Sequence, residues 1–231
     1  MTNVYTFWEG PMPAYIRLCM DTWPFPYTVL NYSNIHNYTD LQIDDRLKRF
    51  SLPQIADVVR VHVLRDQGGY WLDADTVMVT DKLPDTTMIG DPQTRANTIG
   101  YLYAHEAHMD MFEQWADYQD KAIVKQNALR WDIMGNAFTD QYVKDHPEIS
   151  IAPVERCWPE TYMIKGDMKR SAKYERLYFH DWYGLSDLKQ TDMLMLHNSW
   201  TPEWYKRLNV VEVLAHHCTL SNILLELIEG D

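Results

Sequence analysis

The fold is decided by residues 51–79, which read SLPQIADVVRVHVLRDQGGYWLDADTVMV. Ser51 and Gln54 have the spacing of a capping box, a hydroxyl at the N-cap and an amide three residues later. Further along, Gly68-Gly69 is a helix stop, and the apolar Tyr-Trp-Leu that follows is typical of a strand. The segment therefore predicts a helix, a glycine turn and a strand that runs into Asp73-Ala74-Asp75.

The predicted helix disagrees with local propensity, because the β-branched run VVRVHV at residues 58–63 favours a strand. Pro53 is tolerated in a first helical turn, and Arg65 suits the negative end of the helix dipole. The capping box, the glycine stop and the length of the segment together favour the helix.

The rest of the chain extends the same pattern. The order of strand, helix and strand at the N-terminus indicates a parallel α/β sheet. No repeat or linker is visible, so we expect one domain over residues 1–231. The expected strands are 4–8, 27–32, 98–104 and 193–196; the expected helices are 14–22, 107–119 and 209–228, with 126–145 mostly helical.

Two carboxylates, Asp73 and Asp75, follow the predicted strand. Residues two apart in a strand face the same side, so both can converge on one hard cation. Mg²⁺ and Mn²⁺ prefer oxygen ligands and keep open positions for substrate phosphates. The alternative is a solvated turn with two acidic residues. The carboxyl edge of an α/β sheet is where ligands bind, and this position favours the cation.

Residues 56–60 (ADVVR) and 68–75 (GGYWLDAD) resemble the signature of D-x-D sugar-binding glycosyltransferases. That signature is roughly S/A-D-x-x-R followed by G-G-x-Y-x-D-x-D. The resembling families are family 32, of capsular and mannosyl transferases, and more distantly the glucosylating domains of large clostridial toxins. The resemblance is specific over residues 55–79. It implies an α/β fold of the GT-A type, with a Rossmann-like nucleotide-binding half and a central mixed β-sheet flanked by helices.

The resemblance also implies a role for individual residues around a Mn²⁺ or Mg²⁺ ion on the donor diphosphate. Asp75 would bind the ion directly, and Asp73 would contact the ribose and the water shell of the metal. Asp57 and Arg60, on one helix face, would contact the donor sugar hydroxyls or a phosphate; a weak surface ion pair is the alternative. Trp8 would stack on the base, and a tryptophan buried in the core is the alternative.

A late segment, His197-Asn198-Ser199-Trp200, follows the last expected strand. Imidazole is a common metal ligand, so His197 is a candidate third ligand, with a purely structural histidine as the alternative. The related transferases close their site with a late loop, which implies that Asn198 and Trp200 lie at the donor. Trp200 would act as a lid that excludes water. Tyr70 is expected beneath the sugar or the base.

These features predict a metal-dependent glycosyltransferase that moves a sugar from a nucleotide-diphospho-sugar, with UDP-sugar first, to a hydroxyl of a glycan or glycolipid acceptor. Family 32 implies retention of the anomeric configuration. Asp132 and Asn136 are candidates for lining the face of the reacting sugar. The alternatives are a metal-dependent nucleotide-sugar hydrolase or phosphotransferase and a non-catalytic nucleotide-sugar-binding module.

The composition of the chain limits the classes of protein and the cellular compartments that fit it. The 231 residues include 33 acidic and 21 basic side chains, a net charge of −12, which argues against a nucleic-acid binder. No run approaches the ~18 apolar residues of a membrane span, and no secretory signal is visible. Three scattered cysteines suit a reducing cytoplasm. The helix expected at 209–228 has a broad apolar face, for which packing on the domain is the first expectation and a weak dimer the alternative.

Overall fold

Helix α2 (Leu52–Gln67) forms as predicted in the computed structural model of the protein. It begins after Ser51, whose amide donates a hydrogen bond to Gln54 Oε1 at 3.2 Å. The valines of the β-branched run are fully buried in the core. Burial of a helix face outweighs a weak preference for strand, because tertiary packing supplies most of the stability of a helix.

A glycine turn joins α2 to strand β3 (Gly69–Leu72). Gly68 and Gly69 have φ values of +65° and +85°, a conformation that residues with a side chain rarely adopt. A Cβ at Gly69 would also lie 2.5 Å from the carbonyl oxygen of Asn3. The turn thus needs glycine, and it delivers Asp73 at the end of β3.

The structure describes residues 3–94, 96–125 and 130–230, and the chain divides into two compact units. Unit 1 comprises Met1–Gly10, Phe25–Asp73 and Asp85–Pro153. Unit 2 comprises Pro11–Pro24, Ala74–Pro84 and Val154–Asp231. One boundary falls inside the D-x-D motif, after Asp73. The single domain over residues 1–231 stays a prediction.

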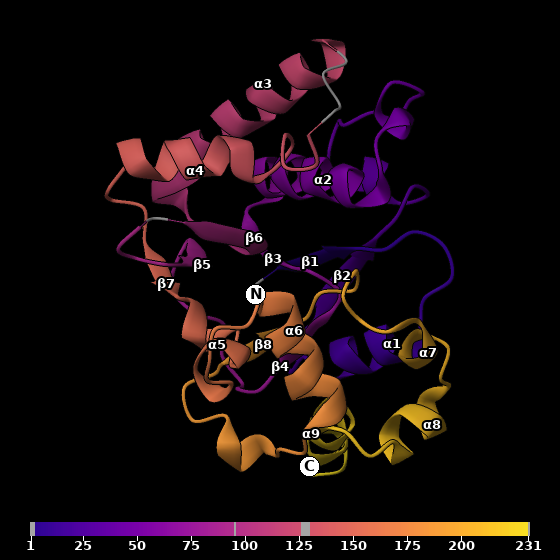
Figure 1. The fold of residues 1–231 in the computed structure, drawn as a ribbon. Coiled ribbons are helices and arrows are strands. Elements are labelled where there is room, and N and C mark those ends of the chain that lie inside the picture. The colour runs from indigo at the N-terminus through magenta and orange to yellow at the C-terminus, as the bar shows by residue number, and fades with distance from the viewer. Residues whose placement is uncertain (1–2, 95, 126–129, 231) are drawn as a thin grey trace. The chain divides into compact units, whose positions relative to one another are not determined.

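A six-stranded mixed sheet forms the centre of unit 1, in the order β2-β1-β3-β6-β5-β7 (Figure 1). All strands run in one direction except β6, which is antiparallel to both of its neighbours. This confirms the predicted α/β architecture with a central mixed sheet flanked by helices. The other strands are β1 (Val4–Phe7), β2 (Tyr27–Leu30), β5 (Met88–Gly90), β6 (Asn97–Ala104) and β7 (Ile151–Pro153).

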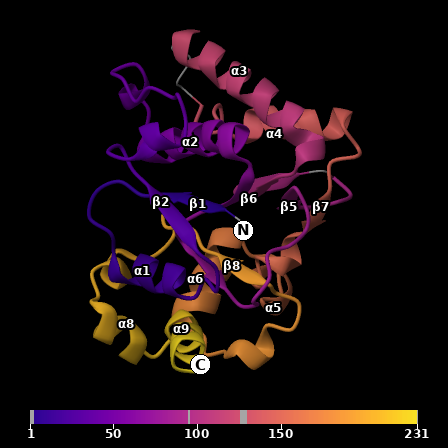
Figure 2. The ribbon, with the colours of Figure 1, turned by 180° about the vertical axis from the view of Figure 1, so that it is seen from behind.

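Three helices cover one face of this sheet: α2, α3 (Met109–Lys125) and α4 (Asn136–Asp145) (Figures 1 and 2). In the stretch predicted as mostly helical, residues 126–129 lie outside the described residues, and α4 is its helical part. Strands β1 and β3 are parallel neighbours, so Trp8 and Asp73 follow the carboxyl ends of adjacent strands. In α/β sheets, this edge is where ligands bind.

Unit 2 is built on a two-stranded antiparallel ladder of β4 (Thr76–Met78) and β8 (Met193–Met195). Its helices are α1 (Ala14–Asp21), α5 (Glu160–Met163), α6 (Arg170–Glu175), α7 (Glu203–Lys206), α8 (Val210–Ala215) and α9 (Thr219–Glu229), with a π-helical turn at Arg176–His180. Short 3₁₀ turns elsewhere in the two units are Ile35–Asn37, Leu47–Arg49, Glu106–His108, Val154–Arg156 and Leu185–Asp187.

The prediction of one continuous helix over residues 209–228 is wrong. The backbone becomes extended at His216 (φ −75°, ψ 137°), where α8 ends, and α9 begins only after Cys218. Within this interruption, His217 stacks on Trp182 with ring centroids 3.9 Å apart. The apolar residues of α9 pack into unit 2 as expected; those fully buried are Leu220, Ile223 and Leu224.

Two further sequence expectations can be compared with the structure. Among the described residues, no helix combines the length and the apolar character needed to cross a membrane. The three cysteines are free thiols, and all three are buried.

Candidate active site

A cluster of Asp57, Arg60 and Asp73, centred on the buried Arg60, lies in unit 1. Arg60, which is only 4% exposed, places Nη2 3.0 Å from Asp57 Oδ1 and 3.0 Å from Asp73 Oδ1. The guanidinium also donates to the carbonyl oxygen of Ile99, and the indole of Trp71 donates to Asp73 Oδ1 at 2.9 Å. The alternative of a surface ion pair is therefore wrong, because the pair is buried and shared with the first aspartate of the D-x-D motif.

Burial changes the proton affinity of Asp57. It raises the pKa of Asp57 from 3.8 to about 7, although the neighbouring Arg60 acts in the opposite direction. The negative charge of Asp73 adds to the increase. A carboxyl group that lies beside a specific charge partner and has a pKa near neutral pH is typical of functional sites. Structural ion pairs produce the same effect.

The segment before α4 borders the cluster. A Cβ at Gly135 would come within 3.2 Å of Asp57 Oδ2, so this glycine lets the segment approach the carboxylate. Asn136 donates from its side chain to the carbonyl oxygen of Asn97 at 2.9 Å. Asp132 instead pairs with Arg130 at 2.6 Å, and hydrogen bonding to that guanidinium lowers the pKa of Asp132. The role of Asp132 and Asn136 at the sugar stays a prediction.

Two aromatic residues were predicted to contact the donor. Trp8 follows β1, where its amide donates to the carbonyl oxygen of Leu30 at 3.0 Å, and its side chain is half-buried. It is thus not the fully buried core tryptophan of the alternative. Tyr70, in β3, stacks on Tyr103 with ring centroids 4.1 Å apart and planes nearly parallel. Their contacts with a sugar or a base stay predictions.

The second aspartate of the motif belongs to unit 2 and meets the late loop there. Asp75 Oδ2 accepts a hydrogen bond from the amide of Asn198 at 2.9 Å, and its carbonyl oxygen accepts from Leu196 at 3.1 Å. The Asn198 side chain in turn accepts from the Tyr15 hydroxyl at 2.5 Å. Pairing of β4 with β8 explains this arrangement, since Asp75 and the late loop flank the two strands. The structure therefore joins two segments that are 123 residues apart.

The imidazole of His197 contacts two other side chains of unit 2. Its Nε2 lies 2.6 Å from Arg170 Nη2, and its ring packs on Trp200 with centroids 4.0 Å apart. Burial, with a smaller contribution from Arg170, lowers the pKa of His197 to about 3, so the ring is neutral and Nε2 accepts from the guanidinium. A role of His197 as a metal ligand stays a prediction, and it would require this hydrogen bond to break.

The donor set of the motif suits a hard cation. No group of three or more histidine, cysteine, aspartate or glutamate side chains within residues 3–94, 96–125 and 130–230 is arranged to hold a metal. Mg²⁺ is commonly held by one or two carboxylates, with substrate phosphates and water completing its coordination. Asp73 and Asp75, which only Ala74 separates in the sequence, supply ligands of this kind, and their binding of a metal ion stays a prediction.

Comparison with known proteins decides the family. Residues 3–148 match the family described as "Capsular polysaccharide synthesis protein". The chain belongs to this capsular polysaccharide synthesis protein family. Membership of this family confirms the expectation that the chain is a glycosyltransferase of polysaccharide biosynthesis. Such an enzyme uses a sugar donor and an acceptor. The region of the match contains Trp8, Asp57, Arg60, Asp73 and Asp75.

No curated protein matches the chain. A similar solved structure is the crystal structure of a glycosyltransferase involved in the glycosylation of the major capsid of PBCV-1. It shares 9% sequence identity at a TM-score of 0.43, and the similarity covers 88% of this chain and 96% of that chain.

Unit 2 also contains a cationic side chain, Arg170, that no motif in the sequence indicated. Arg170 lies with its Cζ 3.2 Å from the ring centroid of Trp158 and 5.3 Å from that of Trp200, and it pairs with the fully buried Glu160 at 3.1 Å. It is 27 residues from His197 in an irregular, aromatic-rich stretch.

Proposed function

We propose that this family member transfers a sugar from a nucleotide-diphospho-sugar, a UDP-sugar, to a hydroxyl of a glycan or glycolipid acceptor. The proposal rests above all on the Asp57–Arg60–Asp73 cluster, whose last member lies two residues before Asp75 in the sequence. The placement of Trp8 and Asp73 at the carboxyl ends of adjacent parallel strands supports it, because nucleotides bind at that edge of α/β sheets.

We assign the diphosphate to a Mn²⁺ or Mg²⁺ ion held by the D-x-D motif. Only Ala74 separates Asp73 from Asp75, so both carboxylates can reach one ion, directly or through water. The ion would neutralise the negative charge that develops on the leaving diphosphate. Arg60 would keep Asp73 oriented, since its guanidinium holds that carboxylate at 3.0 Å.

In unit 2, we assign to Arg170 a share in neutralising the charge of the diphosphate. It contacts His197 of the late loop, whose next residue donates to Asp75. The ring of Trp200 packs on His197 and would exclude water, which competes with the acceptor hydroxyl. In unit 1, Asp57 would accept hydrogen bonds from donor sugar hydroxyls when ionised. Family 32 resemblance is the basis for proposing retention.

Product analysis tests this assignment. The protein is incubated with Mn²⁺, with UDP-glucose, UDP-galactose or UDP-N-acetylglucosamine, and with a panel of mono- and disaccharide acceptors. We expect UDP release together with a new glycoside whose anomeric configuration, measured by NMR, matches that of the donor. Free sugar as the only product under every condition would instead identify a hydrolase.

A matched pair of arginine variants examines the diphosphate assignment. Arg170→Met should lower kcat by about 10²-fold or more, because charge stabilisation in the transition state is lost. Arg176→Met is the control, since Arg176 is 54% exposed and pairs with Asp181 at 3.4 Å. Equal activities of the two variants would remove Arg170 from the mechanism.

A further inference from the structure

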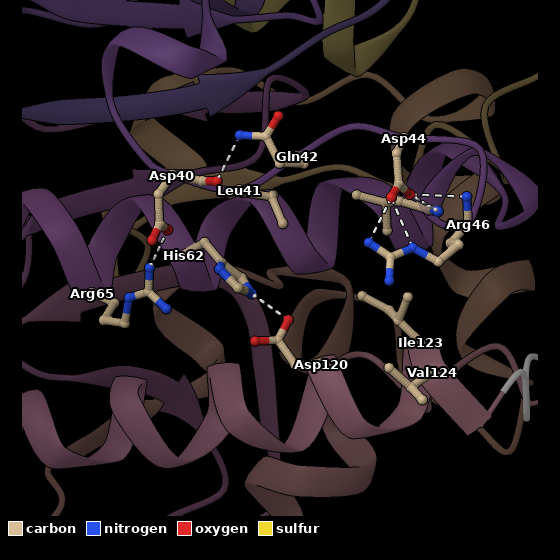
Figure 3. Close-up of a pocket in the computed structure, with 11 residues that line it drawn as sticks. Asp40, Leu41, Gln42, Asp44, Arg46, His62, Arg65, Asp120, Ile123 and Val124 are labelled. Atoms are coloured by element: carbon tan, nitrogen blue, oxygen red, sulfur yellow. Dashed lines mark hydrogen bonds and ion pairs between the residues drawn. The ribbon is translucent and has the colours of Figure 1, made fainter.

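Unit 1 contains a cavity of about 320 Å³ that lies away from the acidic cluster and that no motif in the sequence indicated (Figure 3). It is formed by α2, by α3 and by the loop that precedes α2. His62 lines it, two residues after Arg60, and residues two apart on a helix do not share a face. The main lining residues are Asp40, Leu41, Asp44, His62, Arg65 and Asp120.

The imidazole of His62 is the unusual feature of this cavity. The side chain is 3% exposed, and within the described part of the chain neither ring nitrogen has a hydrogen-bond partner. The carboxylate of Asp120 is 3.6 Å from Nε2, and Figure 3 shows it across the cavity from the ring. Burial lowers the pKa of His62, so the neutral ring offers one donor and one acceptor. Buried polar groups are nearly always hydrogen-bonded, to protein, to ordered water or to a ligand, so this ring marks a place in the cavity wall where a polar ligand can bind.

The remaining walls combine fixed polar groups with apolar surface. Arg65 Nη2 donates to Asp40 Oδ1 at 2.8 Å, and Arg46 pairs with Asp44 at 2.6 Å. These two ion pairs lie at opposite ends of the cavity (Figure 3). His62 and Asp120 lie between them, and the apolar lining residues are Leu41, Leu47, Ile123 and Val124. A ligand would therefore meet carboxylate acceptors, guanidinium donors, one imidazole and several aliphatic side chains.

The side chains that line the cavity favour some classes of ligand over others. A phosphorylated ligand is disfavoured, because three carboxylates face two guanidinium groups and both guanidinium groups are already paired. A metal ion is disfavoured too, since no three-ligand group occurs among the described residues. A neutral polyhydroxylated ring fits, because its hydroxyls both donate and accept and its C–H face suits aliphatic side chains.

We propose that this cavity binds a neutral saccharide of one or two rings, as a glycan-binding site separate from the donor site. In a polysaccharide synthesis protein, such a site would hold part of the acceptor or product chain. The site uses none of Asp57, Arg60, Asp73 and Asp75, so it goes beyond the proposed function and does not depend on a nucleotide or a metal.

A ¹H–¹⁵N NMR titration of the full chain tests this proposal. Glucose, galactose, N-acetylglucosamine and maltose are added without nucleotide and in the presence of EDTA. We expect at least one sugar to give saturable shifts of the His62 ring nitrogens and of amides in 40–47 and 119–124. Inorganic phosphate and, without EDTA, MgCl₂ are titrated in parallel. No saturable response to any of the sugars, or saturation by phosphate or Mg²⁺ alone, would overturn the assignment.

Variants on α3 provide the matched control. Asp120→Ala should weaken sugar binding by about tenfold, the effect of losing one hydrogen bond to a charged group. Asp117→Ala removes the same charge from an exposed position that does not line the cavity, and it should leave affinity unchanged. His62→Gln keeps a donor and an acceptor and should weaken binding less than His62→Leu. Equal sugar affinity of the Asp120 and Asp117 variants would contradict a saccharide site in this cavity. That result would not bear on donor binding at the D-x-D motif.

Discussion

Replacing Asp57 by asparagine should make the protein more stable at alkaline pH, although it should impair the enzyme. The side chain is 14% exposed, and burial raises its pKa from 3.8 to about 7 in the folded protein. Between these values the native state binds more protons than the unfolded state. Stability contributed by this group is therefore present below pH 4 and is lost as the pH rises through 7.

The size of the effect follows from the same two values. Each tenfold change in proton affinity corresponds to about 1.4 kcal/mol, so the interval from 3.8 to about 7 corresponds to at most about 4 kcal/mol. Asparagine has nearly the same shape and never ionises. The free energy of unfolding of Asp57→Asn minus that of the wild type should thus increase from pH 4 to pH 8 by up to about 4 kcal/mol.

Urea unfolding followed by circular dichroism at four pH values between 4 and 8 measures this difference. Asp117→Asn, on an exposed position of α3, is the control and should give a difference that does not change with pH. If the Asp57→Asn difference is also constant across this range, Asp57 is ionised throughout and the reasoning from its burial is wrong.

Two further predictions concern stability. Arg60→Met should lower the free energy of unfolding by about 3–5 kcal/mol, since it leaves the largely buried Asp57 without its cation. Arg65→Met, on the more exposed end of the same helix, should cost at most about 1 kcal/mol; similar urea midpoints for the two variants would contradict a buried cluster. Gly69→Ala should cost more than the ~1–3 kcal/mol typical of backbone strain, because its Cβ would meet the Asn3 carbonyl oxygen at 2.5 Å. Gly10→Ala has the same positive φ but open space, so thermal melts should show a smaller loss, and equal losses would exclude the close approach.

Local signals in the sequence were sufficient for the helix, turn and strand that carry the motif. The capping box at Ser51 and Gln54 and the two glycines act within a few residues, so they can be recognised without the fold. The interruption between α8 and α9 could not be recognised in this way. His217 stacks on Trp182, which is 35 residues earlier, and apolar periodicity continues across the gap.

The candidate site was predictable where the family signature is continuous. Asp57, Arg60 and Asp73 were predicted as site residues and are in contact. Their burial was not predicted, because it depends on the sheet that packs against α2. Arg170 and the His62 cavity were missed for the same reason: their partners come from distant segments, and neither residue lies in a motif.

The most direct measurement of the central claim is a thermal-shift titration with UDP-, GDP- and dTDP-sugars in the presence of Mn²⁺ or of a chelator. We predict that a UDP-sugar with Mn²⁺ raises the Tm, since a ligand that binds only the folded state stabilises it by mass action. Chelator and the Asp75→Ala change should each abolish the shift, whereas Asp81→Ala, at an exposed position of the same unit, should preserve it. A Tm that no nucleotide sugar changes, or a shift that survives both chelator and Asp75→Ala, would contradict a cation-assisted donor site at the D-x-D motif.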